Sequence, residues 1–209
     1  MSDVFKDSNP THLHPALEKI TGVILAGGES RRYGRNKALV EIDRVPLIER
    51  VIRVMESIFQ DLIVITNTPE AYSYLELPMH KDLIKGLGPL GGIYTALKSI
   101  STEAGFFVAC DMPFLNRELI RHMVESSGNF DAVVPRIGGN VEALHAIYTT
   151  RCLPAIERLI DSRQYQIMKI FPDVSVRYVQ EREIRRFDPE LKSFLNINKP
   201  HELGRSNTR

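Results

Sequence analysis

Short, mostly apolar runs recur along the chain and end abruptly at glycine or polar residues. The four clearest runs span residues 23–26, 62–65, 106–110 and 131–135. Apolar runs of this length are typical of strands that are buried on both faces of a sheet. Between the first two runs, apolar residues at 47–58 recur every three or four positions, which predicts an amphipathic helix that Pro46 opens. We therefore expect a β-α-β unit with parallel strands and a right-handed crossover.

The rest of the chain continues this alternation less regularly. A helical stripe covers 92–100, and Asn116 is placed to cap the helix that follows it. A turn signal at 138–140 separates 131–135 from a returning strand at 144–148, which predicts a hairpin-like excursion. The remaining expected elements are helices at 153–161 and 165–171, a strand at 174–179, and a last strand at 194–198 followed by a helix that Pro200 opens. This alternation predicts the α/β fold class.

Length and charge narrow the function classes. The 209 residues suffice for one sizeable hydrophobic core. With 27 basic and 26 acidic residues the formal net charge is +1, which gives no electrostatic footprint for nucleic acid, and we expect no nucleic-acid partner. No apolar run is long enough to span a membrane, so we expect no membrane partner either.

The chain ends and the cysteines add expectations about organisation and compartment. We expect residues 1–20 to form a flexible extension, 21–204 a single domain and 205–209 a frayed tail. The first 20 residues lack the apolar core of a signal peptide. Cys110 and Cys152 offer neither a disulfide framework nor a zinc spacing, so a reducing, cytoplasmic location is the expectation.

The first apolar run leads into a loop that is rich in glycine and basic residues. Gly27 and Gly28 end the run, and the cations that follow are Arg31, Arg32, Arg35 and Lys37. Backbone N–H groups of such a loop converge on an anion while its cations neutralise the charge, so the loop is suited to phosphate. The P-loop pattern fails because Arg35 stands where lysine is required, and the loop lacks the G-x-G-x-x-G dinucleotide fingerprint.

A second glycine-rich segment offers a rival interpretation. Residues 86–91 match G-x-G-x-x-G, and Asp111 follows Gly91 by 20 residues, as in a dinucleotide-binding site. That fingerprint should leave a strongly apolar strand, whereas residues 79–82, Met-His-Lys-Asp, form a poor one. The junction of strand and glycine at Gly27 is the better candidate for a nucleotide site.

Polar side chains follow the other buried runs. Ligands of parallel sheets bind beyond the carboxyl ends of the strands, which places Asn67 and Asp111 beside the glycine loop. A carboxylate at Asp111 suits Mg²⁺, which proteins usually hold through one or two carboxylates plus substrate phosphates. A mere capping role for Asp111 is less attractive because Asn116 already supplies a cap. Close by in the expected excursion, His145 has two open interpretations: a buried, hydrogen-bonded core residue or a substrate-binding one.

Taken in order, these motifs resemble the molybdenum cofactor guanylyltransferases of the MobA type. The matching stretches are L-A-G-G-E-S-R-R-Y-G-R-N-K at 25–37, G-P-L-G-G-I at 88–93, C-D-M-P-F-L at 110–115, E-A-L-H-A-I-Y at 142–148 and N-I-N-K-P-H-E-L at 196–203. The resemblance covers about residues 20–204, and the last two motifs are the more specific ones. It implies a Rossmann-like three-layer sandwich with a mostly parallel central sheet, the nucleotidyltransferase fold. It also implies an enzyme that uses Mg²⁺ to transfer GMP from GTP to molybdopterin, releasing pyrophosphate.

By matching position, the resemblance implies a role for individual residues. The implied nucleotide-binding residues are Leu25, Ala26, Gly27, Gly28, Lys37, Asn67, Asp82 and Asp111. Lys37 and Asp111 would be catalytic, with Asp111 also the metal ligand, and Asn196 and Asn198 in the C-terminal half would bind the acceptor. The resemblance further implies transient contact with molybdenum insertion proteins or molybdoenzymes.

Two departures leave alternatives open. The loop of the family usually reads M-G-x-D-K, whereas Tyr33 and Asn36 replace its Met and Asp here. One alternative is a related transferase that uses CTP or a sugar-phosphate acceptor. The other is a protein that binds GTP without catalysis because its loop has degenerated at Asn36.

Overall fold

The structure is a computed structural model that describes residues 17–27 and 37–197. The strands are β1 (Ile20–Leu25), β2 (Glu41–Ile42), β3 (Val45–Pro46), β4 (Leu62–Ile65), β5 (Met79–His80), β6 (Ala104–Ala109), β7 (Ala132–Ile137), β8 (Asn140–Val141), β9 (His145–Thr149) and β10 (Val176–Gln180). The helices are α1 (Leu47–Glu56), α2 (Pro89–Ser99), α3 (Arg117–Glu125), α4 (Leu153–Asp161) and α5 (Glu181–Ile184). Short 3₁₀ segments lie at Leu17–Lys19, Lys37–Leu39, Pro69–Leu75, Thr150–Cys152, Ile167–Asp173 and Lys192–Phe194.

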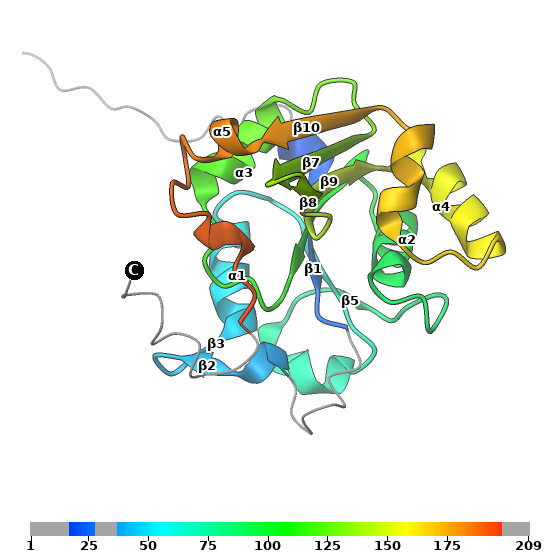
Figure 1. The fold of residues 1–209 in the computed structure, drawn as a ribbon. Coiled ribbons are helices and arrows are strands. Elements are labelled where there is room, and N and C mark those ends of the chain that lie inside the picture. The colour runs from blue at the N-terminus through cyan, green and yellow to red at the C-terminus, as the bar shows by residue number, and fades with distance from the viewer. Residues whose placement is uncertain (1–16, 28–36, 198–209) are drawn as a thin grey trace, which may run out of the picture.

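An eight-stranded sheet crosses the centre of the molecule in the order β10-β7-β9-β6-β1-β4-β5, with β8 added onto β7 (Figure 1). Strands β6, β1, β4 and β5 run parallel, so their carboxyl ends meet at one edge, here called the active edge. Strand β9 runs antiparallel to both neighbours, β6 and β7, while β10 is parallel to β7. The amino end of β9 also reaches the active edge, because His145 pairs with Val108 near the end of β6.

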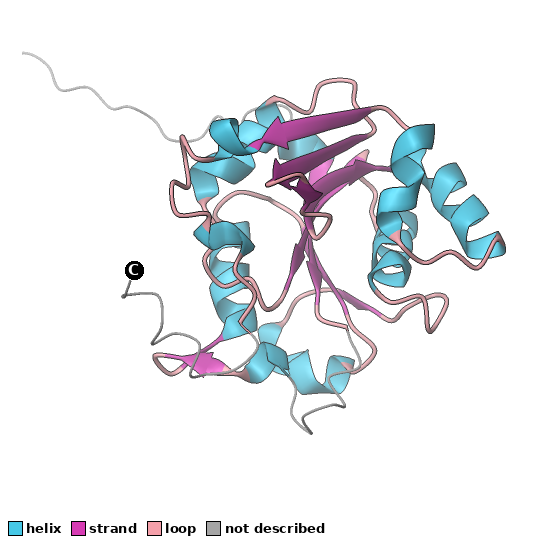
Figure 2. Ribbon diagram, in the orientation of Figure 1, coloured by secondary structure: helices cyan, strands magenta, loops and turns pink. Residues whose placement is uncertain are grey.

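Helices cover both faces of this sheet (Figure 2). On one face α1, α3 and α5 enclose a core cluster that includes Met55 and Phe106. On the other, α2 and α4 enclose a second cluster that includes Ile93 and Phe107. Phe106 and Phe107 belong to opposite faces because successive residues of a strand point to opposite sides. The predicted three-layer sandwich with a mostly parallel central sheet is confirmed.

The expected elements differ from the structure mainly at their ends. All six residues of β1 are buried, as the apolar run predicts. Helix α2 begins at Pro89, ahead of the expected start at 92, because proline is favoured in the first helical turn, where no N–H is needed. The Asn116 side chain caps α3 by accepting a hydrogen bond from the Leu119 N–H at 2.9 Å, as predicted. The segment Leu17–Lys19 and the start of β1 lie inside the stretch expected to be an extension.

The predicted last strand is wrong for its described residues. Lys192–Phe194 form a 3₁₀ segment, and residues 195–197 run outside the sheet. A strand at this position would have to pair with β6, but β6 already lies between β1 and β9 and has no free edge. Residues 195–197 touch the active edge through one backbone hydrogen bond, from the Ile197 N–H to the Asp111 carbonyl at 3.0 Å. Asn198 and the helix expected after Pro200 lie outside the described residues. Across 17–27 and 37–197, no helix combines the length and apolar character needed to cross a membrane.

Candidate active site

Four loops leave the active edge side by side, after β1, β4, β5 and β6. Backbone hydrogen bonds continue the sheet pairing past the strand ends and hold these loops in register. The Ala26 N–H donates to the Ile65 carbonyl at 2.9 Å, and the Cys110 N–H donates to the Leu25 carbonyl at 3.1 Å. On the far side, the Thr66 N–H donates to the His80 carbonyl at 2.9 Å. The predicted convergence of the polar loops at one rim is therefore present for their described residues.

The loop after β1 presents backbone rather than side chains. Leu25 and Ala26 are buried and Gly27 is exposed. Among the described residues, a Cβ added to Gly27 would meet nothing closer than the Ile65 carbonyl at 3.9 Å, so none of them crowds its backbone. Gly28 and the basic residues at 31–35 lie outside the described residues.

Asn67 and Asp82 form a reciprocal pair. The Asn67 Nδ2 donates to Asp82 Oδ2 at 2.7 Å, and the Asp82 backbone N–H donates to Asn67 Oδ1 at 3.1 Å. Two such bonds fix the orientation of both the amide and the carboxylate. The two positions that the resemblance assigns to nucleoside binding, 15 residues apart in sequence, are thus one unit.

Helix α2 starts at the active edge immediately after this pair. Gly86 and Gly88 have φ of +83° and +58°, values that side-chain-bearing residues rarely adopt, and they turn the chain into Pro89. The buried Thr95 Oγ1 accepts from the Leu83 N–H at 2.9 Å and ties the Asp82 loop to the helix. The rival fingerprint at 86–91 therefore follows the two-residue edge strand β5 rather than a central strand.

Close packing brings α2 onto β1. A Cβ added to Gly92 would come within 2.9 Å of Leu25 Cδ2, which only glycine avoids without a shift of the leucine. The free N–H groups of the first turn of a helix carry partial positive charge and favour anions. This approach places the amino end of α2 beside the carboxyl end of β1.

Asp111 lies just beyond β6 and close to Lys37. Burial raises the pKa of the Asp111 carboxyl, and the Lys37 ammonium is the nearest opposing influence, which lowers it. Burial also raises the pKa of the neighbouring Cys110 thiol to about 12, so that thiol stays protonated and is no nucleophile at neutral pH. Lys37 and Asp111, the two predicted catalytic residues, are brought together.

The donor set around Asp111 fits a metal that is shared with a substrate. In the described part of the chain, no group of three or more His, Cys, Asp or Glu side chains could hold a metal by itself. A single half-buried carboxylate with an open polar edge is what Mg²⁺ uses when substrate phosphates complete its coordination. The residues present therefore fit Mg²⁺ better than a resident transition metal.

The loop before β9 completes the edge. His145 of β9 pairs with Val108 of β6 in antiparallel register. Glu142 lies three residues before His145, and Asp111 lies three residues after Val108. Both carboxylates therefore lie at the same edge of the sheet. Glu142 is half-buried, and this burial raises its pKa. His145 is fully buried, so the substrate-binding interpretation is not supported. The core interpretation holds without its hydrogen bond, because neither ring nitrogen has a partner among the described residues.

The two predicted acceptor residues are only partly accounted for. Asn196 is exposed and directly precedes Ile197, whose N–H donates to the Asp111 carbonyl. This bond brings Asn196 to the Asp111 side of the edge. Asn198 lies outside the described residues.

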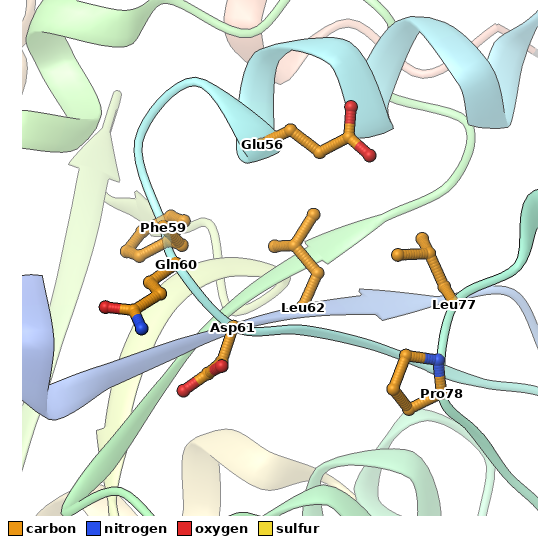
Figure 3. A pocket seen from close by; sticks show the side chains of 7 residues that line it. All are labelled: Glu56, Phe59, Gln60, Asp61, Leu62, Leu77 and Pro78. Atoms are coloured by element: carbon orange, nitrogen blue, oxygen red, sulfur yellow. The ribbon is translucent and has the colours of Figure 1, made fainter.

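A pocket of about 270 Å³ lies elsewhere (Figure 3). Its lining residues are Glu56, Phe59, Gln60, Asp61, Leu62, Leu77 and Pro78. Asp61 directly precedes β4 and Pro78 directly precedes β5, so the pocket faces the amino ends of these strands. It is therefore at the opposite end of the sheet from Asn67 and Asp111 and takes no part in the site.

Comparison with known proteins agrees with this arrangement. Residues 22–178 match the model of the MobA-like NTP transferase domain. The chain belongs to the MobA-like NTP transferases. It is 40% identical over 183 residues to a probable molybdenum cofactor guanylyltransferase of Pelotomaculum thermopropionicum, covering 88% of this chain and 89% of that one. It is 37% identical over 192 residues to the molybdenum cofactor guanylyltransferase of Desulfosudis oleivorans, covering 91% and 95%.

A solved structure supports the same family. The molybdopterin-guanine dinucleotide biosynthesis protein A of Archaeoglobus fulgidus superposes with a TM-score of 0.76 at 30% identity, covering 88% of this chain and 95% of that one. The resemblance drawn from the motifs is thus confirmed, and this MobA-like NTP transferase is an enzyme of the nucleotidyltransferase class.

Sequence reasoning missed several residues that shape the site of this MobA-like transferase. Thr95, which holds the Asp82 loop, is one of many small residues in a helical stripe. Asp188 and Ser193 support Asn116 from a stretch without periodicity, and Ser193 lies 77 residues away from its partner. Only the Asp-Pro step at 188–189, a common turn signal, marks that stretch as structured.

Proposed function

We propose that this chain transfers GMP from GTP to molybdopterin, forming the guanine dinucleotide cofactor and releasing pyrophosphate. The relatives of this chain among the molybdenum cofactor guanylyltransferases support this substrate pair. The observation that carries the proposal for this chain is the reciprocal Asn67–Asp82 pair on the same edge as Lys37 and Asp111. It joins a fixed polar surface for a base with a cation and a carboxylate for phosphates.

Asp82 selects guanine in this proposal. Guanine presents an N1–H and an amino group as adjacent donors beside an O6 acceptor, whereas adenine and cytosine present other patterns. A carboxylate has about four acceptor positions, and the Asn67 Nδ2–H uses one of them. The others suit the two guanine donors, while backbone N–H groups near Gly27 serve O6. Leu25, Ala26, Gly27 and Gly28 line the guanosine in this arrangement.

Catalysis rests on positioning and charge. A phosphate oxygen of molybdopterin attacks the α-phosphorus of GTP in line, and the bond to the pyrophosphate breaks. A phosphomonoester needs little help from a general base, so orientation and charge neutralisation carry the rate. Lys37 neutralises the triphosphate and the leaving pyrophosphate. The N–H groups at the start of α2 stabilise phosphate oxygens at the same edge.

Asp111 would hold Mg²⁺ for this reaction. When bound, Mg²⁺ supplies a Lewis acid that withdraws charge from phosphate oxygens. Burial keeps the Asp111 carboxylate poorly solvated, and the Lys37 ammonium helps to keep it ionised. Asn196 orients the acceptor from the Asp111 side, and the family resemblance gives Asn198 the same substrate.

The proposal includes a reducing, cytoplasmic location, which the free cysteines Cys110 and Cys152 favour. It also includes transient contact with molybdenum insertion proteins or molybdoenzymes, because the guanylylated cofactor is transferred to the proteins that use it.

The direct test is pyrophosphate release with GTP, CTP, ATP and UTP, each with and without molybdopterin and Mg²⁺. We expect release with GTP that requires molybdopterin. Equal turnover of CTP would indicate a related cytidylyltransferase, and GTP binding without pyrophosphate release would indicate a non-catalytic protein.

Asp82→Ala sharpens this test. We expect the ratio of kcat/KM for GTP to that for CTP to fall by about tenfold or more, because a site built to hydrogen-bond its ligand strongly rejects a mismatched one. Asp61→Ala, which removes an exposed carboxylate at the opposite end of the sheet, is the matched control. An unchanged ratio in Asp82→Ala would remove Asp82 from base selection while leaving the transferase reaction intact.

A further inference from the structure

The segment of residues 187–197, here called the strap, runs along the α1 and α3 side of the sheet from beyond α5 to Asp111. It contains no strand, and its one regular stretch is the 3₁₀ segment Lys192–Phe194. Even so, it is attached at three places along its length. The attachments lie at its start, at Phe194 and at Ile197.

The first attachment is a buried hydrogen-bond network at the start of α3. The Asp188 carboxylate, 6% exposed, accepts from the Lys192 N–H at 3.0 Å and the Ser193 N–H at 2.7 Å. The Ser193 Oγ in turn accepts from the Asn116 N–H at 3.0 Å, and Asn116 Nδ2 donates to the Phe187 carbonyl at 2.9 Å. Asn116 therefore joins the strap to α3 while it caps the helix.

The second attachment is an aromatic stack that His145 completes. The Phe194 ring lies 4.9 Å from the imidazole, centroid to centroid, and Phe106 lies 5.3 Å from it at an interplanar angle of 83°. Phe106 stacks in turn on Phe59 at 5.5 Å. This row lies on the α1 face of the sheet and connects the strap to Phe59, just beyond the end of α1.

A histidine at this buried position is energetically unfavourable. Both ring nitrogens are buried and lack a hydrogen-bond partner among the described residues, and burying an unpartnered polar group is unfavourable. An aliphatic residue would avoid this penalty but would offer Phe194 no flat, polarised ring. The imidazole instead packs on Phe194 at an interplanar angle of 54° and meets Phe106 edge to face, so it lies between the strap and β6.

The third attachment reaches the predicted metal ligand. The Ile197 N–H donates to the Asp111 carbonyl at 3.0 Å, and the Ile197 side chain is buried with Ile42 and Leu47. Between Phe194 and Ile197 stand only Leu195 and Asn196, both exposed. Asn196 is thus held at the edge between two anchored neighbours.

We infer that His145 and Phe194 are positioning residues: they seat the strap so that Asn196 meets the acceptor phosphate beside Asp111. This inference rests on the proposed function, which gives Asn196 the acceptor. In the described part of the chain, attachments of the strap run to β9, α3 and Asp111, and none runs to Asn67 or Asp82. The strap therefore sets the position of the acceptor rather than that of the guanine base. A displacement of about 1 Å at a reacting group reduces the rate by about a hundredfold, so the position in which these two residues hold the strap affects turnover.

The experiment compares Phe194→Ala, His145→Ala and the double variant with the conservative variants Phe194→Leu and His145→Phe. KM for GTP, KM for molybdopterin and kcat are measured by pyrophosphate release, and hydrogen exchange of the Ile197 amide is followed by mass spectrometry or NMR. Lys192→Ala is the control, because this exposed strap side chain pairs only with the exposed Glu190 in the described part of the chain.

We expect Phe194→Ala to raise KM for molybdopterin about tenfold and to lower kcat, with KM for GTP changed less than about twofold. His145→Ala should give the same pattern, and the double variant should be no worse than either single one. His145→Phe should restore most of the molybdopterin KM, and Phe194→Leu should be intermediate. The Ile197 amide should exchange faster in both alanine variants.

The exchange measurement separates this inference from the proposed function. If the wild type does not use molybdopterin, the proposed function fails, and exchange at Ile197 still decides whether Phe194 and His145 seat the strap. Unchanged Ile197 exchange in folded Phe194→Ala or Phe194→Leu overturns the inference. So does a rise in KM for GTP that matches the rise for molybdopterin.

Discussion

The two halves of the active edge are built by different means. On the side of β1, β4 and β5, three parallel strands deliver their loops to one edge, and the polar residues follow the strand ends directly. On the side of β6 and β9, neighbouring strands run antiparallel, and the third component is a strap outside the sheet. The first half is fixed by strand direction, whereas the second depends on long-range attachments between Asn116, His145 and residues 187–197.

Under the proposed function, this difference gives the two halves different tasks. The parallel half presents backbone and the Asn67–Asp82 pair, a rigid surface that suits an invariant ligand such as a nucleotide. The strap half presents Asn196 on an exposed two-residue span, which leaves it accessible to the acceptor. Asp111 belongs to both halves, because its side chain lies near Lys37 while its carbonyl accepts from Ile197.

The largest effect is expected at this junction. Asp111→Asn should lower kcat by about a hundredfold or more, because it replaces a metal-binding carboxylate with a neutral amide of the same shape. The backbone bond to Ile197 is retained, so strap and fold should remain intact. The rate is measured by pyrophosphate release over a Mg²⁺ titration, alongside thermal unfolding.

Asp173→Asn is the matched control for that variant, since Asp173 forms only an exposed ion pair with Arg158 in the described structure. If Asp111→Asn keeps near-wild-type turnover and an unchanged Mg²⁺ dependence, the metal assignment is wrong. The junction would then be structural only.

The next effect concerns the nucleotide half. Lys37→Ala should reduce kcat/KM for GTP by about ten- to a hundredfold, because a hydrogen bond to a charged group contributes about 1.5–3 kcal/mol. KM for molybdopterin should change little, which distinguishes this variant from those in the strap. Lys98→Ala, on the outer surface of α2 and paired with Glu157, is the control. A change below about threefold would make Lys37 an ordinary surface charge.

The contrast between the halves also explains what the sequence predicted. Buried runs end at polar residues, so parallel strand direction places Asn67 and Asp111 together. Asp82 is implied only by the family resemblance, because residues 79–82 form a poor strand pattern. For residues 194–198 the same reasoning failed, because an apolar run beside asparagines reads as a strand although the sheet has no vacant neighbour there. Strap contacts such as Asn116–Ser193 span 77 residues and leave no local pattern.

The buried imidazole predicts a pH dependence of stability. Burial lowers the pKa of His145 from 6.5 to about 4, so the unfolded chain takes up its proton first as the pH falls. Stability is therefore fully present above about pH 6.5 and is lost progressively down to about pH 4, by roughly 2 kcal/mol at pH 5. Urea unfolding at pH 7 and pH 5 measures this loss.

His145→Phe isolates that contribution, because it removes the buried imidazole, which the nearby Asp188 influences, and keeps every carboxylate of the chain. The difference in unfolding free energy between wild type and variant should change by about 2 kcal/mol from pH 7 to pH 5. A difference that is independent of pH would show that His145 is protonated, or exposed, in the folded protein. The packing of Phe194 on a buried, neutral His145 would then not hold the strap in place.

The smallest effect gives the closest comparison of the two halves, because a buried hydroxyl in each half accepts from the backbone N–H of a separate segment. Thr95 Oγ1 accepts from Leu83 at 2.9 Å, and Ser193 Oγ accepts from Asn116 at 3.0 Å. Thr95→Val and Ser193→Ala each leave one N–H unpaired and should each cost about 1–2 kcal/mol of unfolding free energy. Their kinetic effects should be opposite: Thr95→Val raises KM for GTP a few-fold, and Ser193→Ala raises KM for molybdopterin a few-fold. If either variant raised both constants equally, the edge would behave as one unit, and the division between a nucleotide half and an acceptor half would not hold.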